Sequence, residues 1–396
     1  MALKIALIAH GRFHAFDLGK SLLARGHDVH LFTDYPGWAV ARFGFPAARV
    51  TSMTRHGVAV RVLNRLAAVG VRLDVVAFMH RWFGRWAARR IARQRWDVVY
   101  VWSSVAEEVL EAARGHARHR WLVRESSHIR FQHALLAAEE QRTGITQDKP
   151  HPWSMAREER EYALADRIVV TSSFSRNSFV AEGIAPARTL LLRAGVRAEL
   201  FRADAARLRA RQQRLLSGAP LRVLYVGTLC FRKGLSDLIA VIRGLPQPQR
   251  FRFQFIGNVM PEVSALVDTV RDRAEFIERL PEAALVERYA DNDVFVIPTI
   301  EDGGPFVLVQ ALAAGLICVA SRNCLGPDLI ADQVNGFLLP IRDPQGLKAV
   351  LERIEGDRAT AAEMVQRAAQ AGCLRDWDDA AGEFEQAVAE CDRAAA

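Results

Sequence analysis

The chain has 396 residues, of which half are hydrophobic and a quarter are charged, and its formal net charge is +8. This length allows two domains with full cores, and the composition is that of an ordinary globular protein rather than a disordered or fibrous one. The five cysteines form neither a CxxC pair nor a Cys/His ligand spacing. That pattern argues against a structural zinc site and for a reducing compartment.

Short apolar segments alternate with helical patterns through the first half of the chain. Met1 leads directly into the first of them without a cleavable signal pattern, so we expect a cytoplasmic protein. Alternation of this kind predicts a parallel, doubly wound sheet. The expected strands are Lys4–Ala9, Asp28–Thr33, Asp97–Trp102, Trp121–Arg124, Arg167–Thr171 and Thr189–Arg193.

The second half repeats this alternation, which predicts a second Rossmann-like lobe. Between the two halves, the polar, Arg/Ala-rich segment Arg202–Pro220 is interpreted as a linker. An amphipathic pattern from Trp377 to about Arg393 predicts a terminal helix. The uncharged residues 303–321 divide into a helix and a strand at glycines, so we expect no membrane span. The expected strands are Leu221–Gly227, Phe251–Gly257, Ala274–Ile277, Asp293–Pro298 and Leu316–Ala320.

Positive charge is concentrated in the first half of the chain. Residues 1–195 carry 29 Lys/Arg and 17 Asp/Glu, and within residues 55–95 ten arginines face one acid, Asp74. Tryptophans are interleaved there, which favours an anionic membrane surface as the partner. No nucleic-acid-binding motif accompanies the basic residues, so we expect no nucleic acid partner. An arginine-rich surface without a partner is the alternative.

The stretch Thr299–Ser321 is the most informative part of the sequence. An apolar strand ends there in Glu301 and Asp302, and a Gly-Gly-Pro turn then opens an Ala-rich helix that carries one polar residue, Gln310. Carboxylates accept hydrogen bonds from sugar hydroxyls, while helix N–H groups attract phosphate. The stretch therefore predicts a site for a sugar that carries a phosphate. We expect the turn that borders the phosphates to comprise Gly303, Gly304, Pro305 and Phe306.

Three further turns follow predicted strands and are candidates for the same site. Gly227–Gly234 contains adjacent cations, Arg232 and Lys233, which are suited to stabilise a diphosphate leaving group. Gly11 would allow the backbone to approach a diphosphate, although a plain turn glycine is the alternative. His128 lies where a strand ends and should face the cleft, unless it is a hydrogen-bonded structural residue.

The stretch that contains Glu301 and Asp302 resembles the two-carboxylate motif of retaining glycosyltransferases of family 4. That family places seven residues between two glutamates, and Asp302 and Gln310 hold this spacing here. The resemblance implies the GT-B architecture, with an N-terminal acceptor-side domain (1–198, joined by a C-terminal helix at about 376–396) and a C-terminal donor domain (199–375). It also implies no essential metal or other cofactor.

The resemblance extends to the other turns. It implies that His128 lies beside the transferred sugar, that Gln310 bonds the ribose hydroxyls, and that Lys233 contacts the donor phosphates, with Thr228 at the place of a family arginine. The remaining positions that it implies near the nucleotide are Gly227, Gly257 and Asn258.

The sequence thus predicts a retaining glycosyltransferase that uses a nucleoside-diphosphate sugar and a glycan or lipid-linked acceptor, in cell-surface polysaccharide or glycolipid synthesis. We expect the chain to be peripheral on the inner face of the plasma membrane. The departures at Asp302, Gln310 and Thr228 leave open a catalytically weakened binding or regulatory protein. A GT-B nucleotide-sugar epimerase is the other alternative.

Overall fold

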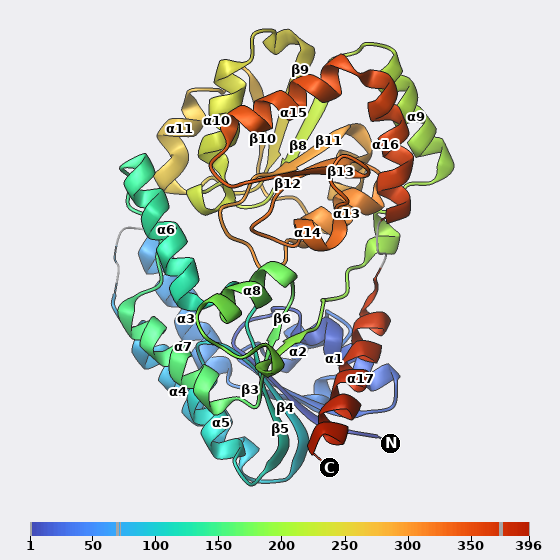
Figure 1. The fold of residues 1–396 in the computed structure, drawn as a ribbon. Coiled ribbons are helices and arrows are strands. Elements are labelled where there is room, and N and C mark those ends of the chain that lie inside the picture. Colours follow the sequence, from blue (N-terminus) through green and yellow to red (C-terminus); the bar gives the residue numbers. More distant parts are fainter. Residues whose placement is uncertain (1, 69–70, 72, 372–374, 396) are drawn as a thin grey trace.

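Two α/β lobes lie one above the other (Figure 1). The computed structural model describes residues 2–68, 71, 73–371 and 375–395. Each lobe is built on one sheet in which all described strand pairs are parallel. The predicted pair of Rossmann-like, doubly wound lobes is therefore confirmed.

The N-terminal lobe contains a seven-stranded sheet in the order β3-β2-β1-β4-β5-β6-β7. Its strands are β1 (Lys4–Ala9), β2 (Asp28–Thr33), β3 (Val50–Ser52), β4 (Trp96–Trp102), β5 (Ala117–Val123), β6 (Arg167–Val170) and β7 (Thr189–Leu191). Its helices are α1 (Ala15–Ala24), α2 (Gly37–Ala41), α3 (Thr54–Ala68), α4 (Val76–Ile91), α5 (Glu107–Ala113), α6 (Ile129–Thr143), α7 (Pro152–Leu164) and α8 (Ser173–Ala181).

The C-terminal lobe contains a six-stranded sheet in the order β10-β9-β8-β11-β12-β13. Its strands are β8 (Leu221–Val226), β9 (Phe251–Ile256), β10 (Ala274–Ile277), β11 (Val294–Ile297), β12 (Ile317–Ser321) and β13 (Gly336–Leu339). The helices of this half are α9 (Ala205–Leu216), α10 (Leu235–Gly244), α11 (Ser264–Asp268), α12 (Glu282–Asp291), α13 (Phe306–Ala313), α14 (Gly326–Leu329), α15 (Pro344–Gly356), α16 (Arg358–Ala371) and α17 (Trp377–Ala395).

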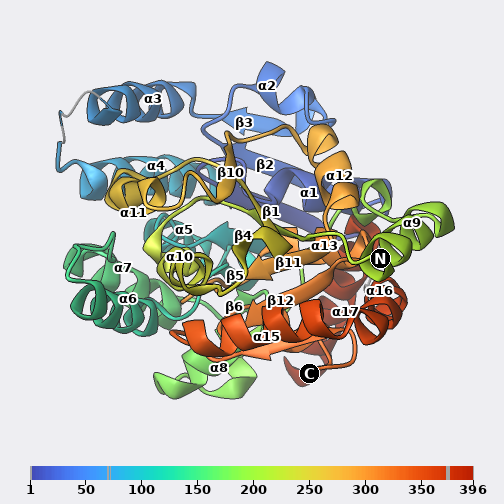
Figure 2. The same cartoon turned by 90° about the horizontal axis from the view of Figure 1, so that it is seen from above.

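Apolar side chains alternate between the two faces of each sheet, and each face is covered by helices. In the N-terminal lobe, α1 and α17 cover one face and α4, α5 and α7 cover the other. In the C-terminal lobe, α10 and α15 lie side by side over one face, as Figures 1 and 2 both show. Because both faces are covered, the strands read as continuous apolar runs, which is why the sequence revealed most of them.

The interpretation of Arg202–Pro220 as a linker is wrong. Most of this segment forms α9, which packs against the C-terminal lobe through Leu208 and Leu215. Arg211 in this helix is buried and donates hydrogen bonds to the carbonyl oxygens of Tyr289 (2.7 Å) and Asn292 (2.8 Å). The polar composition of the segment suggested that it is exposed to solvent. The guanidinium of Arg211 is instead buried, because it donates to backbone carbonyl groups at the end of α12.

The chain passes from one lobe to the other between β7 and α9 and again between α16 and α17, and described residues of the two segments are in contact. The backbone N–H of Val196 donates to the carbonyl oxygen of Arg375 at 3.0 Å. After the second passage α17 packs on α1, and Arg25 binds the carboxylates of Asp378 and Glu385 there. None of the described helices is both long and apolar enough to cross a bilayer.

Candidate active site

A cavity of about 940 Å³ lies between the lobes, where the carboxyl ends of both sheets face one another. The loop after β1 lines it from the N-terminal lobe, and the loops after β8 and β9, together with α13, line it from the C-terminal lobe. The structure brings six of the sequence-predicted residues together around this cavity: Gly227, Thr228, Gly257, Asn258, Phe306 and Gln310.

Two glycines shape the floor of this cavity. Gly227 (φ 149°) and Gly257 (φ 152°) end adjacent strands in a backbone conformation that favours glycine. A Cβ atom on Gly257 would overlap the carbonyl oxygen of Gly227, so the two turns touch. Peptide groups with no side chains between them are thereby presented to the cavity, as a diphosphate or a nucleotide base requires.

Glu301 is fully buried at the junction of the lobes. Its Oε1 accepts hydrogen bonds from the backbone N–H and the hydroxyl of Ser127, both at 2.9 Å. Its Oε2 accepts from Nε2 of Gln132 at 2.9 Å and from Nη1 of Arg232 at 3.1 Å. Burial alone would raise the pKa of Glu301, but the Arg232 charge and the Ser127 hydrogen bonds outweigh it and hold the pKa below its usual range. Glu301 is therefore an ionised carboxylate with four donors.

Asp302 points to a different partner. Its carboxylate forms an ion pair with Lys233, and its Oδ1 accepts from the backbone N–H of Gly304 at 3.4 Å. Arg232 and Lys233 form a short 3₁₀ turn after β8, and Gly234 (φ 72°) ends the turn against the carbonyl oxygen of Pro298. In the predicted acid and cation pairs, Glu301 thus contacts Arg232 and Asp302 contacts Lys233.

Gln310 lies on α13 beside the cavity and is mostly buried. The hydroxyl of Tyr289 donates to its Oε1 at 3.2 Å, which directs the amide. Tyr289 was not predicted, because one tyrosine in a helical pattern carries no distinguishing signal. Pro305 precedes the first helical residue of α13, Phe306, and Gly303 and Gly304 lie just before it.

His128 occupies a buried position rather than the cavity wall. It is the N-cap of α6, where its Nδ1 accepts from the backbone N–H of Arg130 at 3.3 Å, and its ring packs on Tyr162 and Phe179. Burial lowers the pKa of His128 to about 4, so the imidazole is neutral. This geometry gives His128 a capping function, and a contact with the transferred sugar stays a prediction.

Gly11 also lies away from the cavity lining. Its φ is 107°, as a tight turn requires, and its N–H donates to Oδ1 of Asp34 at 2.9 Å. The residues that follow it, Arg12, Phe13 and His14, line the cavity instead. Sequence reasoning therefore identified the loop but not the residues in it that face the cavity.

His14 is a site residue that the sequence did not reveal. Its ring meets Phe306 edge-on, with 4.1 Å between ring centroids, and stacks on Trp377 at 5.7 Å. Nε2 of His14 lies 3.7 Å from Oε2 of Glu125, and Oε1 of Glu125 accepts from Nε1 of Trp102 at 2.9 Å. His14 thus connects the N-terminal lobe, α13 and α17 at one edge of the cavity.

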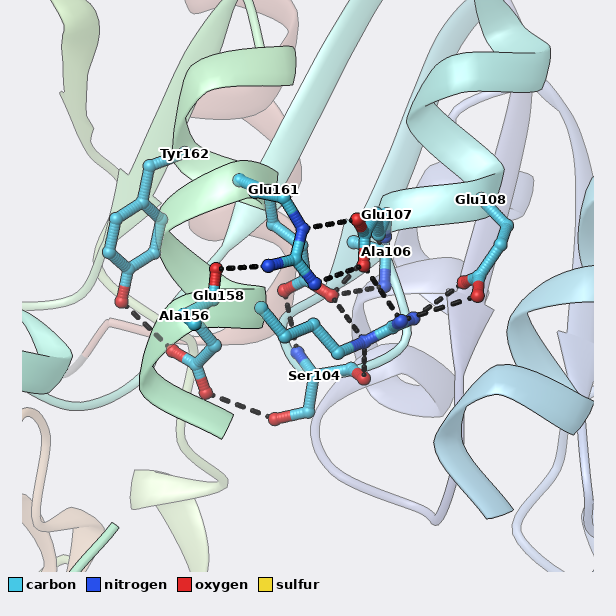
Figure 3. Close-up of polar contacts among 10 residues, drawn as sticks. Ser104, Ala106, Glu107, Glu108, Ala156, Glu158, Glu161 and Tyr162 are labelled. Atoms are coloured by element: carbon cyan, nitrogen blue, oxygen red, sulfur yellow. Dashed lines mark hydrogen bonds and ion pairs between the residues drawn. The ribbon is translucent and has the colours of Figure 1, made fainter. Parts of the chain in front are cut away.

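A buried polar network joins α7 to α5 and to the loop after β4 in the N-terminal lobe (Figure 3). Glu158 accepts from the hydroxyls of Ser104 (3.0 Å) and Tyr162 (2.9 Å), and Glu161 accepts from the backbone N–H of Ser104 at 2.8 Å. Nε of Arg124 lies 3.1 Å from Oε2 of Glu158. Through Arg124, at the end of β5, the network extends to the side chains around Glu301.

Within the described residues, no three His, Cys, Asp or Glu side chains are grouped so that they could hold a metal ion. The expected independence of a metal remains a prediction. The positive charges in the lining of the cavity are those of Arg12, Arg197 and Arg279, whereas Arg232 and Lys233 lie outside that lining.

Family models match both halves of the chain. The model described as Glycosyltransferase Family 4 matches residues 12–200, and the model described as Glycosyl transferases group 1 matches residues 207–371. Together they span every described strand except β1, and all the residues that line the cavity except Trp377.

Several curated proteins are similar to the chain. The amylovoran biosynthesis glycosyltransferase AmsK of Erwinia amylovora is 33% identical over 152 residues, which cover 35% of this chain and 37% of that protein. The D-inositol 3-phosphate glycosyltransferase of Streptomyces bingchenggensis is 24% identical over 348 residues, covering 83% and 73%. The matches to AmsK and to the sulfoquinovosyl transferase of Arabidopsis thaliana span 37% and 41% of those proteins, less than half of each.

Solved structures share the fold over nearly the whole chain. Sucrose-phosphate synthase from Thermosynechococcus elongatus has a TM-score of 0.73 at 20% identity, covering 98% of this chain and 99% of that one. Anabaena HepE in complex with UDP has a TM-score of 0.70 at 14% identity, covering 98% and 100%. At these identities the likeness shows the architecture alone.

Proposed function

The chain belongs to the glycosyltransferases of family 4 and group 1 with the GT-B fold, as its sequence resemblance predicted, and on this premise we propose that it is a retaining glycosyltransferase that uses a nucleoside-diphosphate sugar. One observation carries the proposal: the pair Glu301–Asp302 meets the pair Arg232–Lys233 at the interlobe junction. Cations that stabilise a leaving diphosphate are thereby placed next to an acid that can hold sugar hydroxyls.

The reaction exchanges one bond at the anomeric carbon for another. The bond to the diphosphate oxygen breaks, the acceptor oxygen bonds to the same face of the sugar, and the acceptor proton passes to the leaving phosphate. Arg232 and Lys233 stabilise the charge that develops on the diphosphate. A separate protein base is not required in this scheme, which accords with a His128 that is buried and whose Nδ1 already accepts a hydrogen bond from the backbone of Arg130.

The contacts of Asp302 and Gln310 support a different part of the donor for each side chain. Asp302 is held by the Lys233 ammonium, and a diphosphate that binds Lys233 would release the Asp302 carboxylate to a donor-sugar hydroxyl. Gln310, directed by Tyr289, would bond the ribose hydroxyls, for which an amide is a suitable partner. The turn Gly303–Phe306 would border the phosphates.

We propose the class of acceptor and the nucleotide base of the donor from the names of relatives and of solved structures. AmsK is named for amylovoran biosynthesis, and proteins of Salmonella typhimurium and Escherichia coli that also match are named as putative colanic acid biosynthesis glycosyltransferases. We extend this to a glycan or lipid-linked acceptor in the synthesis of a cell-surface polysaccharide or glycolipid. HepE was solved with UDP and with UDP-glucose, which makes UDP the first nucleotide to test.

A membrane surface is the proposed partner of α3 and α4. Phe78 (64% exposed), Val58 (50%) and Val62 (49%) project to solvent from these helices among exposed arginines such as Arg81. Helix α3 runs along the outer edge of the N-terminal lobe (Figure 2). Apolar side chains among arginines suit an anionic headgroup layer, where the chain would be cytoplasmic and peripheral.

The catalytic proposal is tested by incubating the chain with UDP-, GDP- and ADP-sugars and a lipid-linked or glycan acceptor. We expect release of one nucleoside diphosphate and, by NMR, a product with the anomeric configuration of the donor. An inverted product would overturn the retaining mechanism. Binding without release would identify a weakened regulatory protein, and free epimerised sugar would identify an epimerase.

The membrane proposal is tested by sedimentation with phosphatidylglycerol-containing vesicles. We expect binding that weakens as salt is added, and weaker binding for Phe78→Ser. Leu216→Ser is the matched control, because Leu216 is 60% exposed on α9 of the other lobe and should leave binding unchanged. Equal binding to neutral and anionic vesicles would contradict the proposal.

A further inference from the structure

Glu301 has no hydrogen-bonding capacity left for a sugar. An ionised carboxylate offers about four acceptor positions, and Ser127 N–H, Ser127 O–H, Gln132 Nε2 and Arg232 Nη1 supply four donors at 2.9 to 3.1 Å. The side chain is also fully buried. In this arrangement the carboxylate is therefore enclosed by protein groups.

Two of those donor residues belong to the other lobe, and one of them, Gln132, is itself oriented by a hydrogen bond from Arg124. Ser127 and Gln132 lie in the N-terminal lobe, at the entry and in the first turns of α6. Nη2 of Arg124 donates to Oε1 of Gln132 at 2.8 Å. Because arginine can only donate, the Gln132 carbonyl must face Arg124, and its NH₂ group must face Glu301.

The loop that carries Glu301 fits the N-terminal lobe at the level of the backbone. A Cβ atom on Gly303 would overlap the carbonyl oxygen of Glu125 and would lie 2.8 Å from Cα of Ser126. The hydroxyl of Thr171 donates to the carbonyl oxygen of Gly303 at 3.0 Å. The φ of Gly303 lies outside the left-handed region, so only the opposite lobe, not its own backbone, requires glycine there.

Glu301 in turn sets the position of a partly exposed cation, Arg232. Nη1 of Arg232 donates to the Glu301 carboxylate at 3.1 Å and to the Glu301 carbonyl oxygen at 3.3 Å. The Arg232 side chain is 35% exposed, so the rest of its guanidinium stays available. Contacts from the N-terminal lobe therefore reach Arg232 through one carboxylate.

We propose that Ser127, Gln132 and Glu301 are positioning residues that fix Arg232 for the leaving diphosphate only when the two lobes are closed. In this proposal Glu301 is a closure latch, that is, a residue whose hydrogen bonds to the opposite lobe form when the lobes close, and it is not a ligand of the donor sugar. The proposal rests on the proposed transferase function for the use of Arg232, whereas the latch itself is a property of the lobes and is testable without turnover.

The decisive variant is Gly303→Ala, because it obstructs closure without changing a charge. Gly356→Ala is the matched control: Gly356 ends α15 in the same lobe, and nothing lies within 4 Å of the position a Cβ atom would take there. Small-angle X-ray scattering of the ligand-free chains should give a larger radius of gyration for Gly303→Ala than for wild type, and an unchanged one for Gly356→Ala. Equal radii for all three would overturn the latch, whatever the chain catalyses.

Kinetics with UDP-glucose as the probe donor then separate positioning from binding. We expect Ser127→Ala and Gly303→Ala each to lower kcat by roughly tenfold or more, which is the scale of hydrogen bonds to a charged group, while KM for the donor changes little. The double variant should lose no more than Gly303→Ala alone, because both act on one contact.

The opposite pattern identifies a sugar ligand. If Glu301→Gln raises KM for UDP-glucose but leaves UDP affinity intact, while Ser127→Ala and Gly303→Ala keep a normal kcat, Glu301 touches the donor sugar and the latch is wrong. Absence of turnover with every nucleotide sugar would remove the transferase proposal, and the scattering comparison would still decide the latch.

Discussion

Two buried glutamates join the lobes, and they are held by different kinds of partner. Glu301, from the C-terminal lobe, accepts from the neutral donors of Ser127 and Gln132 across the junction. Glu139, on α6 of the N-terminal lobe, accepts from a cation across the junction, Arg342, at 3.0 Å. Neutral hydrogen bonds weaken steeply with distance and angle, whereas charge attraction falls off slowly.

These two kinds of partner indicate a separate role for each end of α6: the near end, which begins beside Glu301, and the far end, which carries Glu139. The far end, where Arg142 also pairs with Glu139 (2.5 Å) and with Asp237 (2.9 Å), is a tether that tolerates small displacements. The near end, at Glu301, is sensitive to displacement and lies beside Arg232, which we propose holds the leaving diphosphate. Substitutions at the near end should therefore change turnover, and substitutions at the far end should change stability.

The largest expected effect is on the chemistry at the near end. Lys233→Ala should lower turnover about a hundredfold or more, the range seen when a group that stabilises developing charge is removed, with little change in melting temperature. Lys348→Ala, on α15 away from the cleft, is the control and should keep full turnover. Steady-state kinetics check both, and near-normal turnover of Lys233→Ala would remove Lys233 from the site.

A smaller effect, on stability, is expected at the far end. Arg342→Met keeps the apolar stem but leaves the buried Glu139 with Arg142 as its cation, so unfolding free energy should fall by about 2 kcal/mol. Arg271→Ala is the matched control, because its pair with Asp268 is exposed (57% for both side chains) and should matter little. Urea denaturation measures both. If Arg342→Met lowers kcat more than Ser127→Ala does, the assignment of tasks fails.

A third effect is absent at neutral pH, appears only on acidification, and concerns the cap beside the near end. The folded-state pKa of His128, about 4, is depressed below that of an unfolded histidine, so the unfolded chain binds more protons as pH falls from about 6.5 to 4. Stability is therefore present at neutral pH and lost over that window, by at most about 1.4 kcal/mol per pH unit. His128→Asn keeps an N-cap acceptor without titrating there. Its melting temperature should depend less on pH, and an unchanged slope would contradict the burial argument.

Much of the fold could be predicted, because parallel strands covered on both faces are uninterrupted apolar runs. Two strands were missed, β3 (Val50–Ser52) and β13 (Gly336–Leu339), with three and four residues at the edges of their sheets. The segment Arg202–Pro220 failed for a different reason, because α9 is polar in composition but contributes a buried arginine, Arg211.

The candidate site was predictable on one side only. The C-terminal lobe presents its groups in contiguous turns after strands, so Arg232, Lys233 and Asp302 could be found from local order. The N-terminal lobe contributes Ser127 and Gln132 from a loop and a helix, and their importance depends on a carboxylate more than 160 positions away in the chain. No local pattern contains that information. Nor could the sequence show that Glu301 is enclosed while Asp302 is paired with Lys233.

The double passage between the lobes limits how they can move. Gly195 in the first passage lies so close to the second that a Cβ atom there would sit 2.5 Å from Cα of Trp377, and Val196 is hydrogen-bonded to Arg375. Because these two segments are fixed to one another, any relative movement of the lobes has to keep them together. Gly195, Val196 and Trp377 also line the cavity, so this edge of the cavity keeps its shape when the lobes move.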